Sequence, residues 1–157
     1  MESLNTYFGM ANNDYLFAKA GMQTGDKLGN YNVVASLCSQ ACGKYMKAVL
    51  ELCFSDREEL LKLLHSHNLR SLYNVIIMKY ELSISSKDCK LVGDFYFDAR
   101  YLGDDFICVN NDDAEECLRI TEQLCKDAKE ILESEMNARR MKKEKLKSYQ
   151  LLMMIKT

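Results

Sequence analysis

The chain has 157 residues, of which 48% are hydrophobic and 28% are charged, and its formal net charge is −2. This length and composition predict one soluble globular domain with a core of its own. They argue against a strongly basic protein whose overall field attracts nucleic acid, and the longest apolar run, at residues 151–155, is far too short to cross a membrane. Because the chain has no proline and only seven glycines, long helices are favoured.

Two amphipathic helices are expected in the first third of the chain. Between Asn5 and Met22, apolar residues recur at steps of three and four, which places them on one face of a helix. A polar, glycine-rich stretch at residues 23–30 predicts a connection. A second helix is predicted over Tyr31 to Cys53, with a buried face formed by Val34, Leu37, Ala41, Tyr45, Ala48 and Leu52.

Two shorter helices are expected next. Ser55 and Glu58 have the spacing of a capping box, in which each side chain accepts a hydrogen bond from the backbone amide of the other residue. This spacing predicts a short helix that begins at Ser55 and runs through Leu64. His67 or Asn68 is then placed to begin another helix, whose apolar residues are Leu69, Leu72, Tyr73, Ile76, Ile77 and Tyr80.

Two further helices complete the expected fold. One is predicted from about Lys87 to Tyr101. The last is predicted from about Asp112 to residue 150, a length of about 57 Å at about 1.5 Å per residue. No strand-length stretch alternates with the period of a strand. These six segments, some of them short, predict an all-α fold, namely an up-and-down bundle of about five helices with short connections and a long C-terminal helix.

The last predicted helix changes character after Met136, where its apolar spacing fades. We therefore expect a single domain over residues 1–157, with a core at about 5–136 and a basic extension at 137–157. Between residues 139 and 147, one acid stands against six basic residues: Arg139, Arg140, Lys142, Lys143, Lys145 and Lys147. The favoured interpretation is a solvated helix end, and the alternative is a contact for RNA, DNA or an acidic partner.

The seven cysteines show no pattern of a metal or disulfide site. Their number is odd, and the sequence contains neither a CxxC pair nor a Cys/His cluster with zinc spacing. Several fall on apolar helical faces, which is typical of small core residues. We expect a reducing, cytoplasmic compartment and no metal.

Three stretches, in this order, resemble the HEPN domain family. SQACGKYMKAVLELC (39–53) is similar to the family's second helix, and HSHNLRSLY (65–73) is similar to the entry to its third helix. FYFDARYLGDDF (95–106), followed by DDAEECLRITEQL (112–124), is similar to its turn and final helix. The resemblance covers about residues 11–133, and it rests on the order and spacing of the three stretches.

This resemblance implies a helical bundle that often forms homodimers. Members of the family include ribonucleases of toxin–antitoxin and defence systems, nucleotide-binding domains, and proteins that act beside a small nucleotidyltransferase. The ribonuclease branch carries an arginine followed, after one residue and four to six more, by a histidine. These two residues can stabilise and protonate a scissile phosphate.

The sequence departs from the ribonuclease pattern. Its only histidines are His65 and His67. Arg57 is followed by seven residues before His65, but it sits in the wrong segment of the resembled fold. Neither Arg70 nor Arg100 has a histidine after it. The sequence therefore favours binding over cleavage, and enzymatic activity is not predicted.

The residues expected to bind a ligand are Lys44, Lys47, His67, Asp98, Arg100 and Tyr101. In the resembled fold they come from the second helix, the start of the third and the end of the fourth. Lysines and an arginine in one groove suit a phosphate, and a tyrosine can stack on a base. The alternatives are structural: His67 caps its helix, Asp98 and Arg100 form a local ion pair, and the lysine stems cover apolar surface.

Three hypotheses follow for the function. The first is a HEPN-like homodimer that binds a nucleotide or another phosphate-bearing ligand without cleaving it, needs no cofactor, and works beside a nucleotidyltransferase. The second is a divergent, metal-independent ribonuclease that uses His67 with Arg100 or Arg70. The third is a pure protein-interaction module that contacts its partner through the bundle or the tail at residues 151–155.

Overall fold

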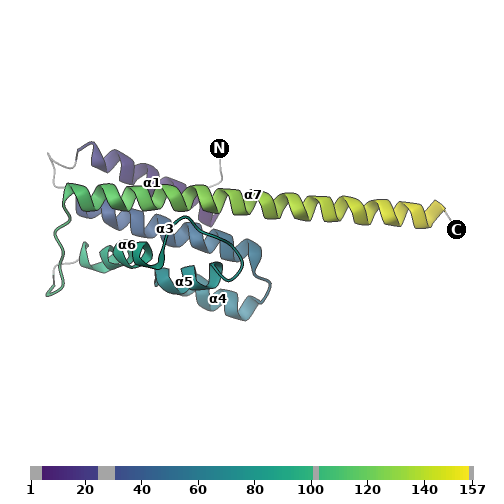
Figure 1. The fold of residues 1–157 in the computed structure, drawn as a ribbon, viewed down its shortest axis with the longest axis horizontal. Coiled ribbons are helices and arrows are strands. Elements are labelled where there is room, and N and C mark those ends of the chain that lie inside the picture. Colours follow the sequence, from purple (N-terminus) through teal and green to yellow (C-terminus); the bar gives the residue numbers. More distant parts are fainter. Residues whose placement is uncertain (1–4, 25–30, 101–102, 156–157) are drawn as a thin grey trace.

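The regular structure of the described residues is entirely helical. The computed structural model describes residues 5–24, 31–100 and 103–155. Within these ranges it contains six helices and no strand, labelled as in Figure 1: α1 (Tyr7–Met22), α3 (Tyr31–Cys53), α4 (Arg57–His65), α5 (Leu69–Ile76), α6 (Ser86–Asp98) and α7 (Asn111–Ile155). The predicted all-α fold with a long C-terminal helix is confirmed.

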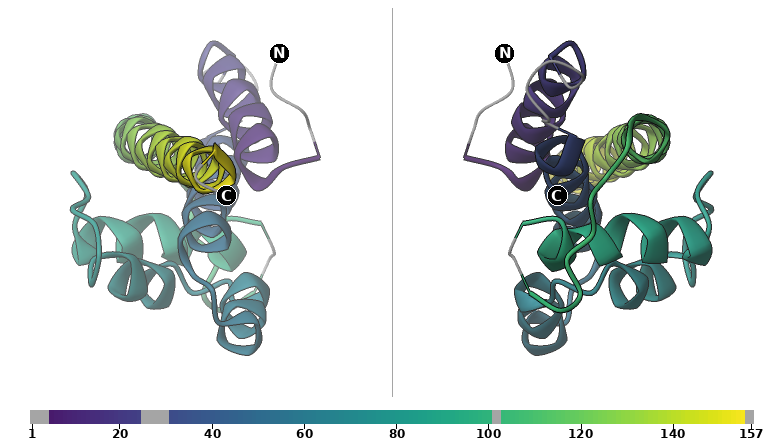
Figure 2. Two further views of the ribbon diagram at one scale, coloured as in Figure 1. Left: turned by 90° about the vertical axis from the view of Figure 1, so that its right-hand side faces the viewer. Right: turned by 90° about the vertical axis from the view of Figure 1, so that its left-hand side faces the viewer.

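Helix α3 is the centre of the bundle and contacts every other helix. Helices α1 and α7 lie over one side of it, and α4, α5 and α6 lie over the other (Figure 2). Small side chains let these neighbours come close. Leu69 of α5, for example, packs where a Cβ at Gly43 would lie 3.4 Å from its Cδ2 atom. The buried core residues of α3 include Val34, Cys38, Ala41, Tyr45, Met46 and Val49.

The N-cap of α4 differs from the prediction. The capping box at Ser55 is wrong, because Asp56 is the N-cap residue. Its Oδ1 atom accepts hydrogen bonds from the backbone amides of Glu58 and Glu59, each at 3.0 Å. An aspartate also suits this position because its negative charge lies at the positive end of the helix dipole.

Two helices end earlier than predicted. Helix α5 begins after its N-cap Asn68, whose Oδ1 accepts from the amide of Ser71 at 3.1 Å, and it ends at Ile76. The chain then turns so that Ser83 can donate both its amide and its hydroxyl to Asp127 of α7, at 2.7 Å each. Helix α6 ends at Asp98, whose carbonyl accepts from the amide of Ile107 at 2.9 Å.

Helix α7 runs along the bundle and then projects beyond it (Figure 1). Its 45 residues correspond to about 67 Å at about 1.5 Å per residue. Among the side chains that the structure describes, Ile131 is its last buried residue. Beyond Ile131, Glu135 accepts from Tyr80 and Lys79, and Arg139 donates to the carbonyl of Leu52 at the end of α3. Within the ranges given above, no helix combines the length and the apolar character that crossing a membrane requires.

Candidate functional site

A small polar pocket, here called the α3 pocket, lies between α3, the α4–α5 connection and α6. Its volume is about 90 Å³. Its polar lining consists of Ser39, Gln40, Lys44, Lys47, Ser66, His67 and Tyr96, and it includes no aspartate or glutamate. Three of the residues expected to bind a ligand therefore meet here: Lys44, Lys47 and His67.

Lys47 is the least favourably placed charge of this pocket. Its side chain and backbone together are only 9% exposed, and it makes no hydrogen bond or ion pair with any described residue. Burial, and secondly the neighbouring charge of Lys44, lowers the pKa of its ammonium group. Partial desolvation of a cation without a counter-charge costs free energy, which a bound anion would offset.

Lys44 differs from Lys47 because it already has a partner. Its ammonium forms an ion pair with Asp14 of α1, and both side chains are largely buried. Beside this pair, the hydroxyl of Tyr45 donates to Oδ1 of Asn12 at 2.6 Å. Lys44 thus holds α1 on α3 while it lines the α3 pocket, and it is not simply a surface lysine.

His67 and Arg100 both pack on one aromatic ring, that of Tyr96. The His67 ring stacks on it with centroids 5.1 Å apart, and Cζ of Arg100 lies 5.8 Å from its centroid. His67 does not cap α5, since Asn68 does. Tyr96 itself was not predicted. The only sequence signal for it is its spacing, four residues before Arg100 near the end of α6.

Arg100 lines a second, adjoining pocket rather than the α3 pocket itself. This pocket is about 280 Å³, and Gln40 lines both. Asn32 also lines this pocket, and its side-chain amide donates to the carbonyls of Ala99 and Ile107 at 3.0 and 2.7 Å. Asp98 lines neither pocket, so the structure does not bring it to the lysines. Tyr101, the sixth expected residue, lies outside the described residues.

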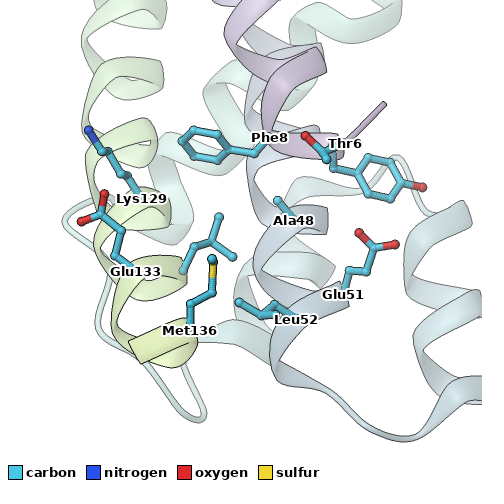
Figure 3. Close-up of a pocket in the computed structure, with 10 residues that line it drawn as sticks. Thr6, Phe8, Ala48, Glu51, Leu52, Lys129, Glu133 and Met136 are labelled. Atoms are coloured by element: carbon cyan, nitrogen blue, oxygen red, sulfur yellow. The ribbon is translucent and has the colours of Figure 1, made fainter. Parts of the chain in front are cut away.

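A third pocket has a different character. It is about 400 Å³ and opens between the start of α1, the end of α3 and the middle of α7. Figure 3 shows Phe8, Leu52 and Met136 turned toward it from these three helices. The only charged residues that line it are Glu51, Lys129 and Glu133. It suits an apolar group, and the sequence analysis did not identify it.

The thiols and acids of the described residues form no metal site. No group of three or more His, Cys, Asp or Glu side chains there could hold a metal ion, and all seven cysteines are free. Burial raises the pKa of Cys38 and of Cys89 to about 12, so both stay protonated at neutral pH. A protonated buried thiol is a poor nucleophile, which agrees with a packing role.

The sequence match to known families decides the identity of this bundle. The model of the HEPN domain matches residues 9–132. The chain belongs to the HEPN family. No curated protein and no solved structure gave a significant match. HEPN membership indicates a module related to nucleotides or RNA, or one that mediates interactions, and HEPN domains often dimerise.

The α3 pocket and the adjoining pocket lie inside the matched HEPN region, and residues 133–157 lie outside it. This HEPN domain does not reproduce the arginine–histidine pairing of the family's ribonucleases. Arg57 and His65 are the first and last residues of α4, and neither lines the α3 pocket. Arg70 instead donates from Nε to the hydroxyl of Ser86 at 3.2 Å.

Proposed function

We propose that this HEPN domain binds a phosphate-bearing ligand, most simply a nucleotide, in the α3 pocket without cleaving it. The observation that carries this proposal is Lys47, a residue that is only 9% exposed as a whole, lines a pocket without a carboxylate, and has no ion-pair partner among the described residues. A phosphate would supply the missing counter-charge through hydrogen bonds that are stronger than those between neutral groups.

The sizes of the two pockets suggest how the ligand lies. The α3 pocket, at about 90 Å³, suits the compact phosphate end, with Lys47, Lys44 and His67 around it. The adjoining pocket of about 280 Å³, with Arg100 on its wall, suits the larger organic part. Gln40 lines both pockets, so one ligand can extend from one into the other.

The test is a thermal-shift titration of the full chain with inorganic phosphate and with nucleotides. A ligand at about 100 times its dissociation constant should add about 2.7 kcal/mol to the free energy of unfolding. Lys47→Met should remove this shift, and Lys47→Arg, which keeps the charge, should lose less. Lys62→Met is the matched control, since Lys62 is an exposed lysine of α4. If Lys47→Met shows the same thermal shift as wild type, the ligand does not bind at Lys47.

A homodimer, and a nucleotidyltransferase as its partner, belong to the same proposal and are supported by the family alone. Light scattering coupled to size-exclusion chromatography would measure the mass of the protein in solution. A monomer at all concentrations would contradict the homodimer. Co-expression with a nucleotidyltransferase encoded nearby, followed by co-purification, would test the second part.

Cleavage of RNA is the second candidate, and one observation favours it. His67 and Arg100 both pack on the ring of Tyr96, so a histidine and an arginine lie near each other without the family's usual spacing. If this pair is catalytic, RNA incubated with the protein is degraded, and His67→Ala stops the degradation. Intact RNA after prolonged incubation would exclude this candidate.

A further inference from the structure

The part of α7 that projects beyond the bundle exposes apolar as well as basic side chains (Figure 1). It is here called the projecting segment and comprises residues 137–155. All of its described side chains, those of residues 137–150, are exposed. Met141, Leu146 and Tyr149 are 58%, 59% and 69% exposed, so the core of the bundle does not hold them.

The apolar side chains of residues 137–150 lie on one side of the helix. Ala138, Met141, Leu146 and Tyr149 follow one another at steps of three, five and three residues, which together make about three turns. The opposite side carries polar residues alone, and four of them are basic: Arg139, Arg140, Lys143 and Lys147. Lys142 and Lys145 lie among the apolar residues, where long stems can follow an apolar surface while the charges reach water. This is the pattern of a basic amphipathic helix.

The last turns of α7 continue this segment with an apolar sequence. The helix runs to Ile155, and all five residues from Leu151 to Ile155 are apolar. Five consecutive residues pass more than once around a helix, because one turn takes about 3.6 residues. The groove of a protein partner covers one side of an amphipathic helix, whereas the acyl chains of a bilayer surround whatever enters them. An apolar stretch that circles the helix therefore favours lipid over a protein groove.

The charge of the projecting segment selects an anionic surface. Arg140 forms an ion pair with Glu144 at 3.8 Å, and Arg139 donates to the carbonyl of Leu52. The remaining bases form no ion pair with any described residue, and they are Lys142, Lys143, Lys145 and Lys147. Two copies of this segment placed side by side would bring like charges together, which disfavours pairing with a second copy. Anionic headgroups instead supply the missing counter-charges.

We propose that the projecting segment binds the surface of an anionic lipid bilayer, with its bases at the headgroups and its apolar side chains in the outer acyl region. Such binding needs no membrane-spanning helix, because an interfacial helix enters only about 5–10 Å. It needs both components, since a short apolar stretch alone binds weakly and a polybasic stretch adds the second attraction. The segment lies outside the HEPN match and the α3 pocket, so lipid binding does not depend on the phosphate ligand proposed above.

The experiment measures co-sedimentation of the full chain with lipid vesicles. One set of vesicles is phosphatidylcholine alone, and the other also contains about one-third phosphatidylserine. We expect binding to the anionic vesicles alone. Lys143→Gln combined with Lys147→Gln should weaken it about 25-fold, because each base near an anionic surface contributes about fivefold. Lys62→Gln combined with Lys126→Gln is the matched control, since it removes two exposed lysines of the bundle and should leave binding unchanged.

A second comparison tests the apolar side of the segment. Leu146→Gln combined with Tyr149→Gln should weaken binding to the anionic vesicles about tenfold or more, because less apolar surface enters the bilayer. Ser148→Gln, on the polar side, should leave binding unchanged. All of these side chains are exposed, so the variants should keep the fold.

Three results would overturn lipid binding by this segment. The first is no binding to the anionic vesicles, or equal binding to the two sets. The second is binding that the changes at Lys143 and Lys147 leave intact. The third is binding that the changes at Leu146 and Tyr149 leave intact, because charge alone would then act, as it would on RNA or any other polyanion. Binding of RNA without binding of vesicles would assign the segment to nucleic acid instead.

Discussion

Asp56 begins α4 with its own side chain, through two hydrogen bonds to the amides of Glu58 and Glu59. We expect Asp56→Ala to lower the free energy of unfolding by about 1 kcal/mol, as the loss of an N-cap usually does. Ser55→Ala is the matched control. Ser55 is exposed and caps nothing, so this change should stay within about 0.5 kcal/mol of wild type. Urea denaturation measures the free energy of unfolding of both variants. A larger loss for Ser55→Ala than for Asp56→Ala would support the capping box at Ser55 instead.

The binding residues show how far single residues can be predicted from sequence. Lys44, Lys47 and His67 line one pocket, and helical spacing places the two lysines on one side of α3. That these residues bind a ligand stays a prediction. The ion pair of Lys44 with Asp14 could not be predicted, since it joins residues 30 positions apart on two helices. The aromatic contact of His67 with Tyr96 is equally non-local, and so is the burial that distinguishes Lys47 from Lys44.

At the scale of elements, Glu135 links α7 to the rest of the bundle near the point where α7 projects beyond it, because it accepts hydrogen bonds from Tyr80 and Lys79. The hydrogen bond from Tyr80, and secondly the one from Lys79, holds the pKa of this carboxyl below its usual value. A carboxyl whose pKa is lower in the folded state stabilises the protein above its unfolded pKa, about 4.3. That contribution is lost as the pH falls through the folded pKa.

We therefore expect Glu135→Gln to be less stable than wild type at pH 7. The difference should shrink as the pH falls below the unfolded pKa of about 4.3 and through the lower folded pKa of Glu135. Denaturation with urea at a series of pH values gives the difference between the two proteins, and other titrating acids cancel from it. Glu133→Gln, two residues away on an exposed position of α7, is the control. A difference that does not change with pH would contradict the role given to Glu135.

Helix boundaries could be predicted where local spacing determines them, and could not be predicted where contacts distant in sequence determine them. The bounds of α3 were predicted to the residue because its apolar face is long and regular. The end of α5 was not, since Ile77 and Tyr80 continue its apolar spacing although the helix stops at Ile76. What ends it lies elsewhere in the chain. Residues 79–83 turn toward α7, where Glu135 and Asp127 accept their hydrogen bonds.

At the scale of the whole molecule, the bundle and the projecting part of α7 differ in burial and in charge. No described side chain beyond Ile131 is buried, and the stretch 139–147 holds six basic residues against one acid. Arg139, which donates to the carbonyl of Leu52, joins the two parts. The projecting helix therefore adds little to the stability of the bundle, and its charge is open to solvent or to a polyanion.

Removal of residues 141–157, which keeps Arg139, tests this division. We expect the free energy of unfolding to stay within about 0.5 kcal/mol of wild type, because no described side chain in the removed part is buried. The thermal shift with phosphate should also be unchanged, since the α3 pocket lies entirely in the bundle.

If the truncated protein loses affinity for RNA, and the affinity of the full chain falls steeply with salt, the basic stretch contacts phosphates. If neither protein binds RNA, the stretch does not contact nucleic acid. A large loss of stability on truncation would contradict this division, because residues 141–150, the described part of the removed segment, bury no side chain on the bundle.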